Sequence, residues 1–217
     1  MAIALVKLPT KKYGLTLRVC KGHFATNHSH TNYYIDVTAQ KFRLSEAKAV
    51  ARELTSVYKY SKPVDTILCL DGTEVIGACM ASDMMKSHVL TSNEHGSLYV
   101  VTPEHTTGSQ LIFRENTMPM IANKHVLILL ASVSTGYTAD SAMQAIRYYG
   151  GEVVGVASIF ATVKEVSGVP ITHIFDTDDL IDYGSWEARN CPLCAQGKKL
   201  DALVNSYGYS NLLTVKT

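Results

Sequence analysis

The chain carries a hydroxyl-rich segment whose residue types suit phosphate binding. It consists of Ser134, Thr135, Gly136, Tyr137 and Thr138. An apolar run precedes the segment and a helical pattern follows it, so we expect a strand-to-helix turn in which Thr138 caps the helix. Gly136 permits a turn that a residue with a Cβ would resist. Backbone N–H groups at a helix N-terminus hold phosphate well, although an ordinary turn of this composition needs no ligand.

A second segment of this kind is Asp71-Gly72-Thr73, which directly follows the apolar run Thr66–Leu70. A pyrophosphate-binding loop requires a small residue and backbone donors, and a carboxylate there could help to hold Mg²⁺. The alternative is a tight turn in which Thr73 caps the following helix. The residue types alone leave both interpretations open.

Cys191 and Cys194 form a CxxC motif. This spacing could supply half of a Zn²⁺ site, but the sequence shows no second pair. A redox CxxC normally opens a helix after a strand, whereas the polar flanks and Gly197 favour a structural turn. We therefore interpret the motif as a turn and keep zinc as the alternative.

Three histidines, His23, His28 and His30, lie close together in a polar stretch. A His-x-His pair on a strand puts both rings on one face, which is half of a metal site. Asn and Ser residues surround these histidines, however, and indicate a loop. A loop histidine could equally contact a substrate.

Strand and helix patterns alternate along the chain, which predicts an α/β fold with a largely parallel central sheet flanked by helices. A helix from Ser45 should bury one face, and residues 102–123 should form an extended loop or hairpin. Because ligands bind at the carboxyl ends of parallel strands, the loops after Leu70 and Leu130 should meet at one cleft. The expected strands are Leu15–Val19, Tyr33–Val37, Thr66–Leu70, Leu98–Val101, Val126–Leu130, Val153–Phe160 and Ile171–Phe175, and two further helices should cover residues 73–86 and 138–149.

Three segments in a fixed order resemble one protein family. Gly22–Asp36, Asp65–Glu74 and His125–Thr138 are similar, in this order, to the N-terminal, pyrophosphate-binding and phosphate-binding segments of orotate phosphoribosyltransferases. These belong to the type I phosphoribosyltransferases, which use phosphoribosyl pyrophosphate (PRPP). The resemblance covers most of residues 15–175.

The resemblance implies transfer of phosphoribosyl from PRPP to a nucleobase, with Mg²⁺ as cofactor and orotate as the first base to consider. Residues 134–138 would hold the 5-phosphate, and residues 71–73 would form the pyrophosphate and Mg²⁺ loop. Phe24, His28 and His30 would lie near the base.

Two departures from the family pattern concern catalysis. Ala131 and Ser132 stand where the family has two acids that bind the ribose hydroxyls, and a charged acceptor binds a hydroxyl about twice as strongly as a neutral one. Thr102 and Pro103 stand where the family has an Arg-Lys pair before a mobile catalytic loop. The candidates to replace those cations are Arg114, Lys124 and His105. The chain is therefore either a divergent transferase or a non-catalytic PRPP- or nucleotide-binding regulator.

Composition favours one compact domain of 217 residues, with an N-terminal hood segment (1–43), a core (44–176) and a C-terminal extension (177–217). Charged residues make up 18%, fewer than usual, which indicates an additional buried surface such as a homodimer interface. The net charge of +1 argues against nucleic acid as a partner, and no apolar run approaches the ~20 residues of a membrane span. The N-terminus does not resemble a secretory signal, and five scattered cysteines suit a cytoplasmic location.

Overall fold

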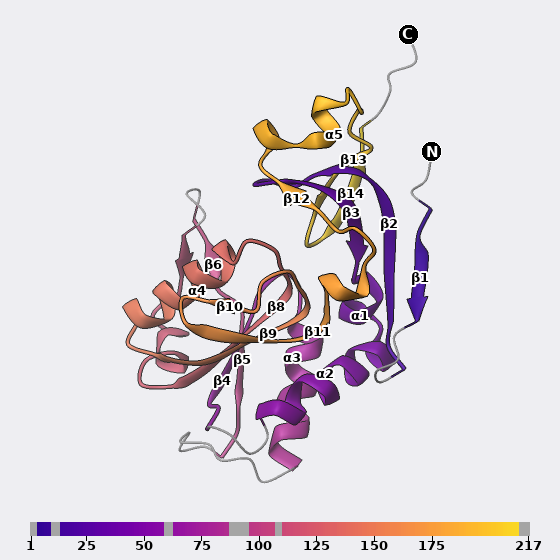
Figure 1. Cartoon of the computed structure of the whole chain (residues 1–217). Helices are drawn as coiled ribbons and strands as arrows, with labels where there is room; N and C mark the ends of the chain where they lie inside the picture. The colour runs from indigo at the N-terminus through magenta and orange to yellow at the C-terminus, as the bar shows by residue number, and fades with distance from the viewer. Residues whose placement is uncertain (1–3, 10–13, 59–62, 87–95, 107–109, 213–217) are drawn as a thin grey trace. The chain divides into compact units, whose positions relative to one another are not determined.

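The computed structural model describes residues 4–9, 14–58, 63–86, 96–106 and 110–212. The chain divides into two compact units (Figure 1). Unit 1 combines Met1–Thr38 with Thr177–Thr217, and unit 2 comprises Ala39–Asp176. Each unit has a sheet of its own.

Unit 2 contains a six-stranded sheet in the order β10-β11-β9-β8-β4-β5. All neighbouring strands are parallel except β10 and β11. This arrangement confirms the predicted parallel α/β fold. The strands are β4 (Thr66–Cys69), β5 (Tyr99–Val101), β8 (His125–Val133), β9 (Glu152–Ala161), β10 (Glu165–Val166) and β11 (Val169–Asp176).

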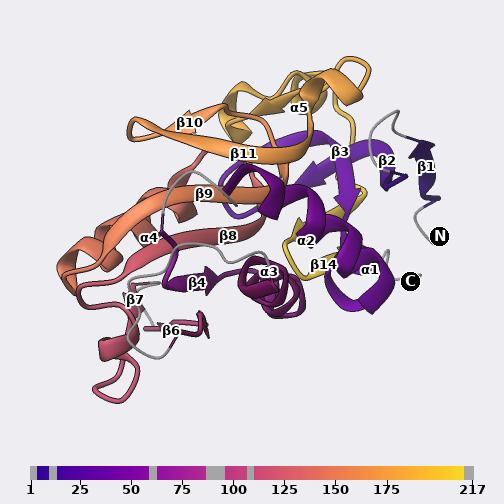
Figure 2. The same ribbon diagram turned by 90° about the horizontal axis from the view of Figure 1, so that it is seen from below.

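Helices cover both faces of this sheet. In β4, Ile67 and Cys69 face Gly77 of α3, whereas Leu68 and Leu70 pack in a core cluster with α4. Such alternation is what a strand buried on both faces produces. Helices α2 and α3 lie side by side (Figure 2). The helices are α1 (Thr38–Phe42), α2 (Leu44–Tyr58), α3 (Glu74–Lys86) and α4 (Tyr137–Tyr148).

Helix α2 shows the amphipathic pattern that the sequence predicts. Its buried residues recur at helical spacing: Ala47, Val50, Ala51, Leu54, Thr55 and Tyr58. The ring of Tyr58 lies against Gly155 of β9, where an added Cβ would come within 2.6 Å of a ring carbon. Its hydroxyl donates to the carbonyl of Val156 at 3.0 Å. The glycine thus allows α2 to pack closely on β9.

The segment after β5 folds as a hairpin, one of the two forms that the sequence predicts. Strands β6 (Glu104–His105) and β7 (Leu111–Ile112) pair antiparallel, and a 3₁₀ helix, η1 (Met118–Met120), follows. Phe113 makes an edge-to-face contact with Tyr149 at the end of α4, with ring centroids 5.2 Å apart. This contact holds the hairpin end against the helix that begins at the hydroxyl-rich segment.

Unit 1 joins the two ends of the chain in one sheet, with strand order β12-β3-β2-β13-β14 and β1 paired to β2. The N-terminal hairpin of β2 and β3 forms its centre (Figure 1). Tyr209 packs edge-to-face on Tyr34 at 5.3 Å, so the C-terminal segment completes this sheet. The elements are β1 (Val6–Pro9), β2 (Thr16–Ala25), β3 (His30–Asp36), η2 (Thr177–Asp179), β12 (Ser185–Trp186), η3 (Ala188–Asn190), α5 (Pro192–Ala195), β13 (Ala202–Asn205) and β14 (Gly208–Asn211).

Within the part of the chain that the structure describes, we find no helix with the length and apolar character needed to cross a membrane.

Candidate functional site

The two candidate loops lie at the same edge of the unit 2 sheet. Strands β5, β4 and β8 are parallel neighbours, so their carboxyl ends point the same way. The hydroxyl of Thr102, just after β5, donates to the Glu74 carboxylate, just after β4, at 3.2 Å. This edge is where open α/β sheets bind ligands.

The hydroxyl-rich segment forms the turn between β8 and α4. Gly136 occupies the N-cap with φ 81°, a conformation that glycine adopts at little cost. The prediction that Thr138 caps the helix is wrong, because the helix already begins at Tyr137 and no side chain caps it. The first helical bond runs from the N–H of Asp140 to the carbonyl of Gly136 at 2.9 Å. As in any α-helix, the N–H groups ahead of that bond have no intrahelical partner and are suited to an anion.

The side chains of this turn are largely exposed. Ser134, Thr135, Tyr137 and Thr138 are all exposed, whereas the backbone of Gly136 is buried. A Cβ at Gly136 would lie 2.5 Å from the Cγ2 of Val166. Glycine is therefore required there both by its backbone conformation and by the space available.

Strand β8 extends three residues beyond its predicted end at Leu130. Successive residues of a strand face opposite sides, and the pattern here leaves Ala131 fully buried and Ser132 exposed. The two positions that correspond to the family's acidic pair thus differ in accessibility. Only Ser132 presents its side chain to solvent beside the turn.

The loop Asp71-Gly72 adopts a left-handed conformation at both residues, with φ 59° and 75°. Thr73 is fully buried, and its hydroxyl donates to the carbonyl of Leu70 at 2.8 Å. The Thr73 hydroxyl is thus turned into the protein, and the pyrophosphate and Mg²⁺ loop expected at residues 71–73 stays a prediction. Asp71 and Gly72 remain partly exposed.

Lys41 lies beside this loop, and the sequence does not predict its position there. Its side chain is only 1% exposed, and its amine donates to the carbonyl of Asp71 at 2.8 Å. A lysine is seldom buried without a specific partner, so a charge at this position is unusual. Through this hydrogen bond the amine holds the backbone of the loop. The sequence gives no signal for this burial.

The thiol of Cys69, which lies close to this loop, is a poor nucleophile at neutral pH. Burial, helped by the negative charge of Glu74, raises the pKa of Cys69 to about 12. The thiol is therefore protonated at neutral pH and is a poor nucleophile.

The three candidate cations have different surroundings. Arg114 pairs with Glu104 at 2.7 Å, and this partner lowers the pKa of the Glu104 carboxyl. His105 is exposed in β6. Lys124 precedes the amino end of β8, so a nine-residue strand, roughly 30 Å long, separates it from the hydroxyl-rich turn. Lys124 is too distant to supply a cation there, and the structure corrects that candidate.

The candidate base-binding residues all lie in unit 1. Phe24 is 1% exposed and packs in an apolar cluster with Tyr34, so its ring serves the core of that unit. His28 is exposed in the turn between β2 and β3. His30 lies beside His23, and the two rings meet edge-to-face. None of these positions adds support to a base-binding role.

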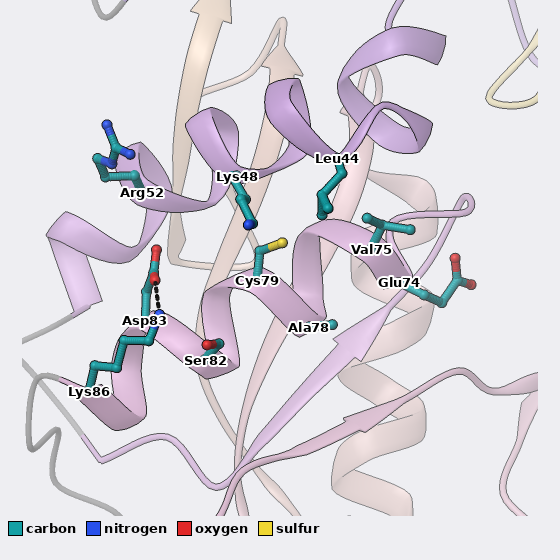
Figure 3. A pocket seen from close by; sticks show the side chains of 10 residues that line it. All are labelled: Leu44, Lys48, Arg52, Glu74, Val75, Ala78, Cys79, Ser82, Asp83 and Lys86. Carbon is teal, nitrogen blue, oxygen red and sulfur yellow. Dashed lines mark ion pairs between the residues drawn. The ribbon is translucent and has the colours of Figure 1, made fainter.

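Helices α2 and α3 also enclose a groove of about 630 Å³ (Figure 3). Lys48 of α2 points toward Cys79 of α3, and Lys86 pairs with Asp83 at 3.8 Å. Of the residues around the two loops, only Glu74 lines this groove. The groove therefore runs along the helices and does not include the hydroxyl-rich turn.

Comparison with known proteins identifies the fold. No protein-family model matches the chain. UMP synthase of Leishmania donovani is similar, with a TM-score of 0.56 and 18% identity over 74% of this chain and 34% of that chain. Adenine phosphoribosyltransferase from Trypanosoma brucei, in complex with AMP, pyrophosphate and ribose-5-phosphate, has a TM-score of 0.53 and 15% identity over 84% of this chain and 90% of that chain.

A third similar structure is orotate phosphoribosyltransferase of Mycobacterium tuberculosis H37Rv in complex with PRPP. Its TM-score is 0.50 and its identity 16%, over 68% of this chain and 83% of that chain. The fold is that of the type I phosphoribosyltransferases, as the sequence predicts. The chain spans about a third of the length of the L. donovani UMP synthase chain.

The role of Gly136 can be tested against a matched glycine at the other end of α4. Gly136 and Gly150 share a positive φ, but only Gly136 has a neighbour that an added Cβ would meet. We expect Gly136→Ala to weaken PRPP binding about tenfold or more, because it displaces the backbone donors. Gly150→Ala should cost a similar backbone strain and leave the affinity unchanged. Calorimetric titration of both variants with PRPP and Mg²⁺ measures this, and an equal loss in both variants would contradict a phosphate site at this turn.

Proposed function

We propose that the protein is a phosphoribosyltransferase that transfers phosphoribosyl from PRPP to a nucleobase. The observation that carries the proposal is the exposed turn at residues 134–138, which ends a buried parallel strand and presents a glycine-capped helix N-terminus. This geometry suits the 5-phosphate of PRPP. The similar M. tuberculosis structure contains PRPP, and the T. brucei structure contains AMP, pyrophosphate and ribose-5-phosphate, which supports the same ligand class here.

The loop after β4 would bind the pyrophosphate end of PRPP. Its two left-handed residues, Asp71 and Gly72, present backbone N–H groups in a concave turn of the kind that binds anions. Buried Lys41 supports that turn from the protein side. The Asp71 carboxylate fits a Mg²⁺ ion bound mainly through pyrophosphate oxygens, and such an ion supplies charge neutralisation for the leaving group.

The ribose would lie between the two loops, where Ser132 is the exposed residue of β8 nearest to the turn. Its hydroxyl can bond a ribose hydroxyl but adds no negative charge for a cationic ribose. The loss of one preorganised group of this kind typically costs about 3 kcal/mol in the transition state, or roughly a hundredfold in rate. We therefore propose a slow transferase that relies on phosphate binding and positioning.

The choice of nucleobase is proposed from the N-terminal segment of the chain. The resemblance of Gly22–Asp36 to orotate enzymes favours orotate and hence pyrimidine nucleotide synthesis. Two of the similar structures act on different bases by name, orotate and adenine. Adenine is therefore the natural second base to try.

We further propose that the protein works as a cytoplasmic homodimer. The charged fraction of 18% is low, and α2 exposes Leu44 and Val57 at 55% and 54%. Exposed apolar side chains at both ends of this helix could be covered by a second copy of the chain.

Turnover is tested directly with the full chain, PRPP, Mg²⁺ and either orotate or adenine. We expect pyrophosphate and the matching nucleotide in equal amounts with one of the bases, and none when the base is omitted. Gly136→Ala should lower the rate at limiting PRPP in proportion to its weaker binding, and Gly150→Ala should preserve the rate. Saturable PRPP binding without any nucleotide formed would contradict the transferase and indicate a binding protein.

The unequal exposure of Ala131 and Ser132 can be tested with an acidic substitution at each position. Ser132→Asp should strengthen PRPP binding, because a charged acceptor then meets a ribose hydroxyl. Ala131→Asp should lower the free energy of unfolding by several kcal/mol, since it places a carboxylate at a fully buried position. PRPP titration and urea unfolding of both variants decide this. Tighter binding only in Ala131→Asp, or an equal loss of stability in both variants, would contradict the assignment of Ala131 to the buried face of β8 and of Ser132 to the exposed face.

A further inference from the structure

Unit 1 contains a compact group of two histidines and two cysteines. Among the described residues, the ligand atoms of His23, His30, Cys191 and Cys194 all lie within 4.8 Å of one another. The histidines come from the N-terminal hairpin and the cysteines from the C-terminal segment, 161 to 171 residues away. The fold thus joins two half-sites that the sequence shows separately.

The spacing of these atoms matches the edges of a zinc tetrahedron. Bond lengths of about 2.0–2.1 Å to nitrogen and 2.3 Å to sulfur give edges of about 3.4 Å between two nitrogens and about 3.6 Å between nitrogen and sulfur. The His23 Nε2 to His30 Nδ1 distance is 3.2 Å. From His23 Nε2 to the sulfurs of Cys191 and Cys194 the distances are 3.5 and 3.7 Å, and from His30 Nδ1 to the sulfur of Cys194 it is 3.3 Å. One ion at the centre would reach all four atoms.

The tautomer of His23 is set by the hydrogen bond that its Nδ1 atom makes. Its Nδ1 lies 2.8 Å from the carbonyl oxygen of Lys198, which can only accept a hydrogen bond. Nδ1 must therefore carry the proton, and the lone pair of Nε2 points at the cysteines. This outer hydrogen bond is typical of metal-binding histidines, since it fixes the ring and the tautomer.

Backbone hydrogen bonds hold both the strand at His23 and the turn that contains the two cysteines. The N–H of His23 donates to the Asp201 carboxylate, and the N–H of Asp201 donates to the carbonyl of His23, both at 2.8 Å. Cys191 caps α5, and Gly197 closes the turn with φ 71° and a bond of 2.9 Å from its N–H to the carbonyl of Cys194. Both sulfurs are thereby presented to the histidines.

The donor set and its burial indicate the kind of metal. Two thiolates and two neutral imidazoles give a neutral centre with a divalent ion, which suits the buried His23 and Cys191. Sulfur and nitrogen ligands in a tetrahedron favour zinc, whereas Mg²⁺ takes oxygen ligands. Cys194 is exposed, so an ion can reach the centre from solvent. Four protein ligands define a structural site with no open position for catalysis.

We propose that His23, His30, Cys191 and Cys194 bind one structural zinc ion that fastens the C-terminal segment to the N-terminal hairpin. The strand pairing between the two segments is short: β12 pairs with β3 at two positions, and so does β13 with β2. The apolar cluster beside the site is also small, with Phe24, Tyr34, Ala202 and Val204 as its buried members. A zinc ion would therefore contribute a large part of the stability of this region.

The test uses the full chain expressed with zinc and purified under reducing conditions. Elemental analysis should find one zinc per chain, and replacement by Co²⁺ should give the intense visible bands of a tetrahedral site with thiolate ligands. Removal of the ion by a chelator should lower the thermal midpoint of unfolding. The site does not depend on the proposed transferase activity, so these readouts need no substrate.

Matched variants assign the ion to these residues. Cys194→Ser and His30→Ala should each lose at least about tenfold in zinc affinity, together with the chelator-dependent shift of the midpoint. His28→Ala, in the same turn but outside the group, and Cys79→Ser, in unit 2, should both retain the ion. Cys194 is exposed, so its serine variant should fold. Less than about 0.1 zinc per chain, a Cys191–Cys194 disulfide that persists under reducing conditions, or equal loss in the control variants would overturn the proposal.

Discussion

The parallel pairing of β5, β4, β8 and β9 is the constraint on which the candidate site depends. Parallel strands end at the same edge, so each loop that leaves them carries its polar groups to one place. The apolar side chains of β4 and β8 hold the strands in this register from both faces of the sheet. The site is thus positioned by a core that takes no part in its chemistry.

At that edge, backbone conformation contributes more to the candidate phosphate site than side-chain charge does. Gly136, Asp71 and Gly72 all adopt left-handed conformations, in the turns that follow β8 and β4. Lys41, which lies next to the Asp71 turn, acts there through a backbone carbonyl. A site of this kind binds phosphates well but offers little negative charge to a cationic ribose. Phosphate binding should therefore be better preserved than catalytic rate.

Local patterns allowed much of unit 2 to be predicted from the sequence. Helical periodicity identified the buried face of α2, and apolar runs identified β4, β8 and β9. The end of β8 lies beyond its predicted position because the polar Ser132 follows the apolar run, although the backbone ladder continues to Val133. The direction of the Thr73 hydroxyl depends on carbonyl groups of two strands, which the sequence does not show.

Long-range features were beyond such reasoning. Lysine is normally exposed, so nothing in the sequence marks Lys41 as buried. The sequence shows no second pair for the CxxC motif because the side chains that contact it, His23 and His30, lie more than 160 residues earlier. Both half-sites were visible as motifs, and only the strand pairing of unit 1 brings them together.

Hydrogen exchange of the full chain with and without PRPP and Mg²⁺ tests the central claim, that the two loops at this edge form one phosphoribosyl site. Ligand binding should slow exchange at the backbone amides of residues 71–74 and 134–140 together, because these donors bind the two ends of one molecule. The amides of α2 that line the groove of Figure 3 should be unaffected. Slowed exchange confined to that groove, or to only one of the two loops, would contradict the account.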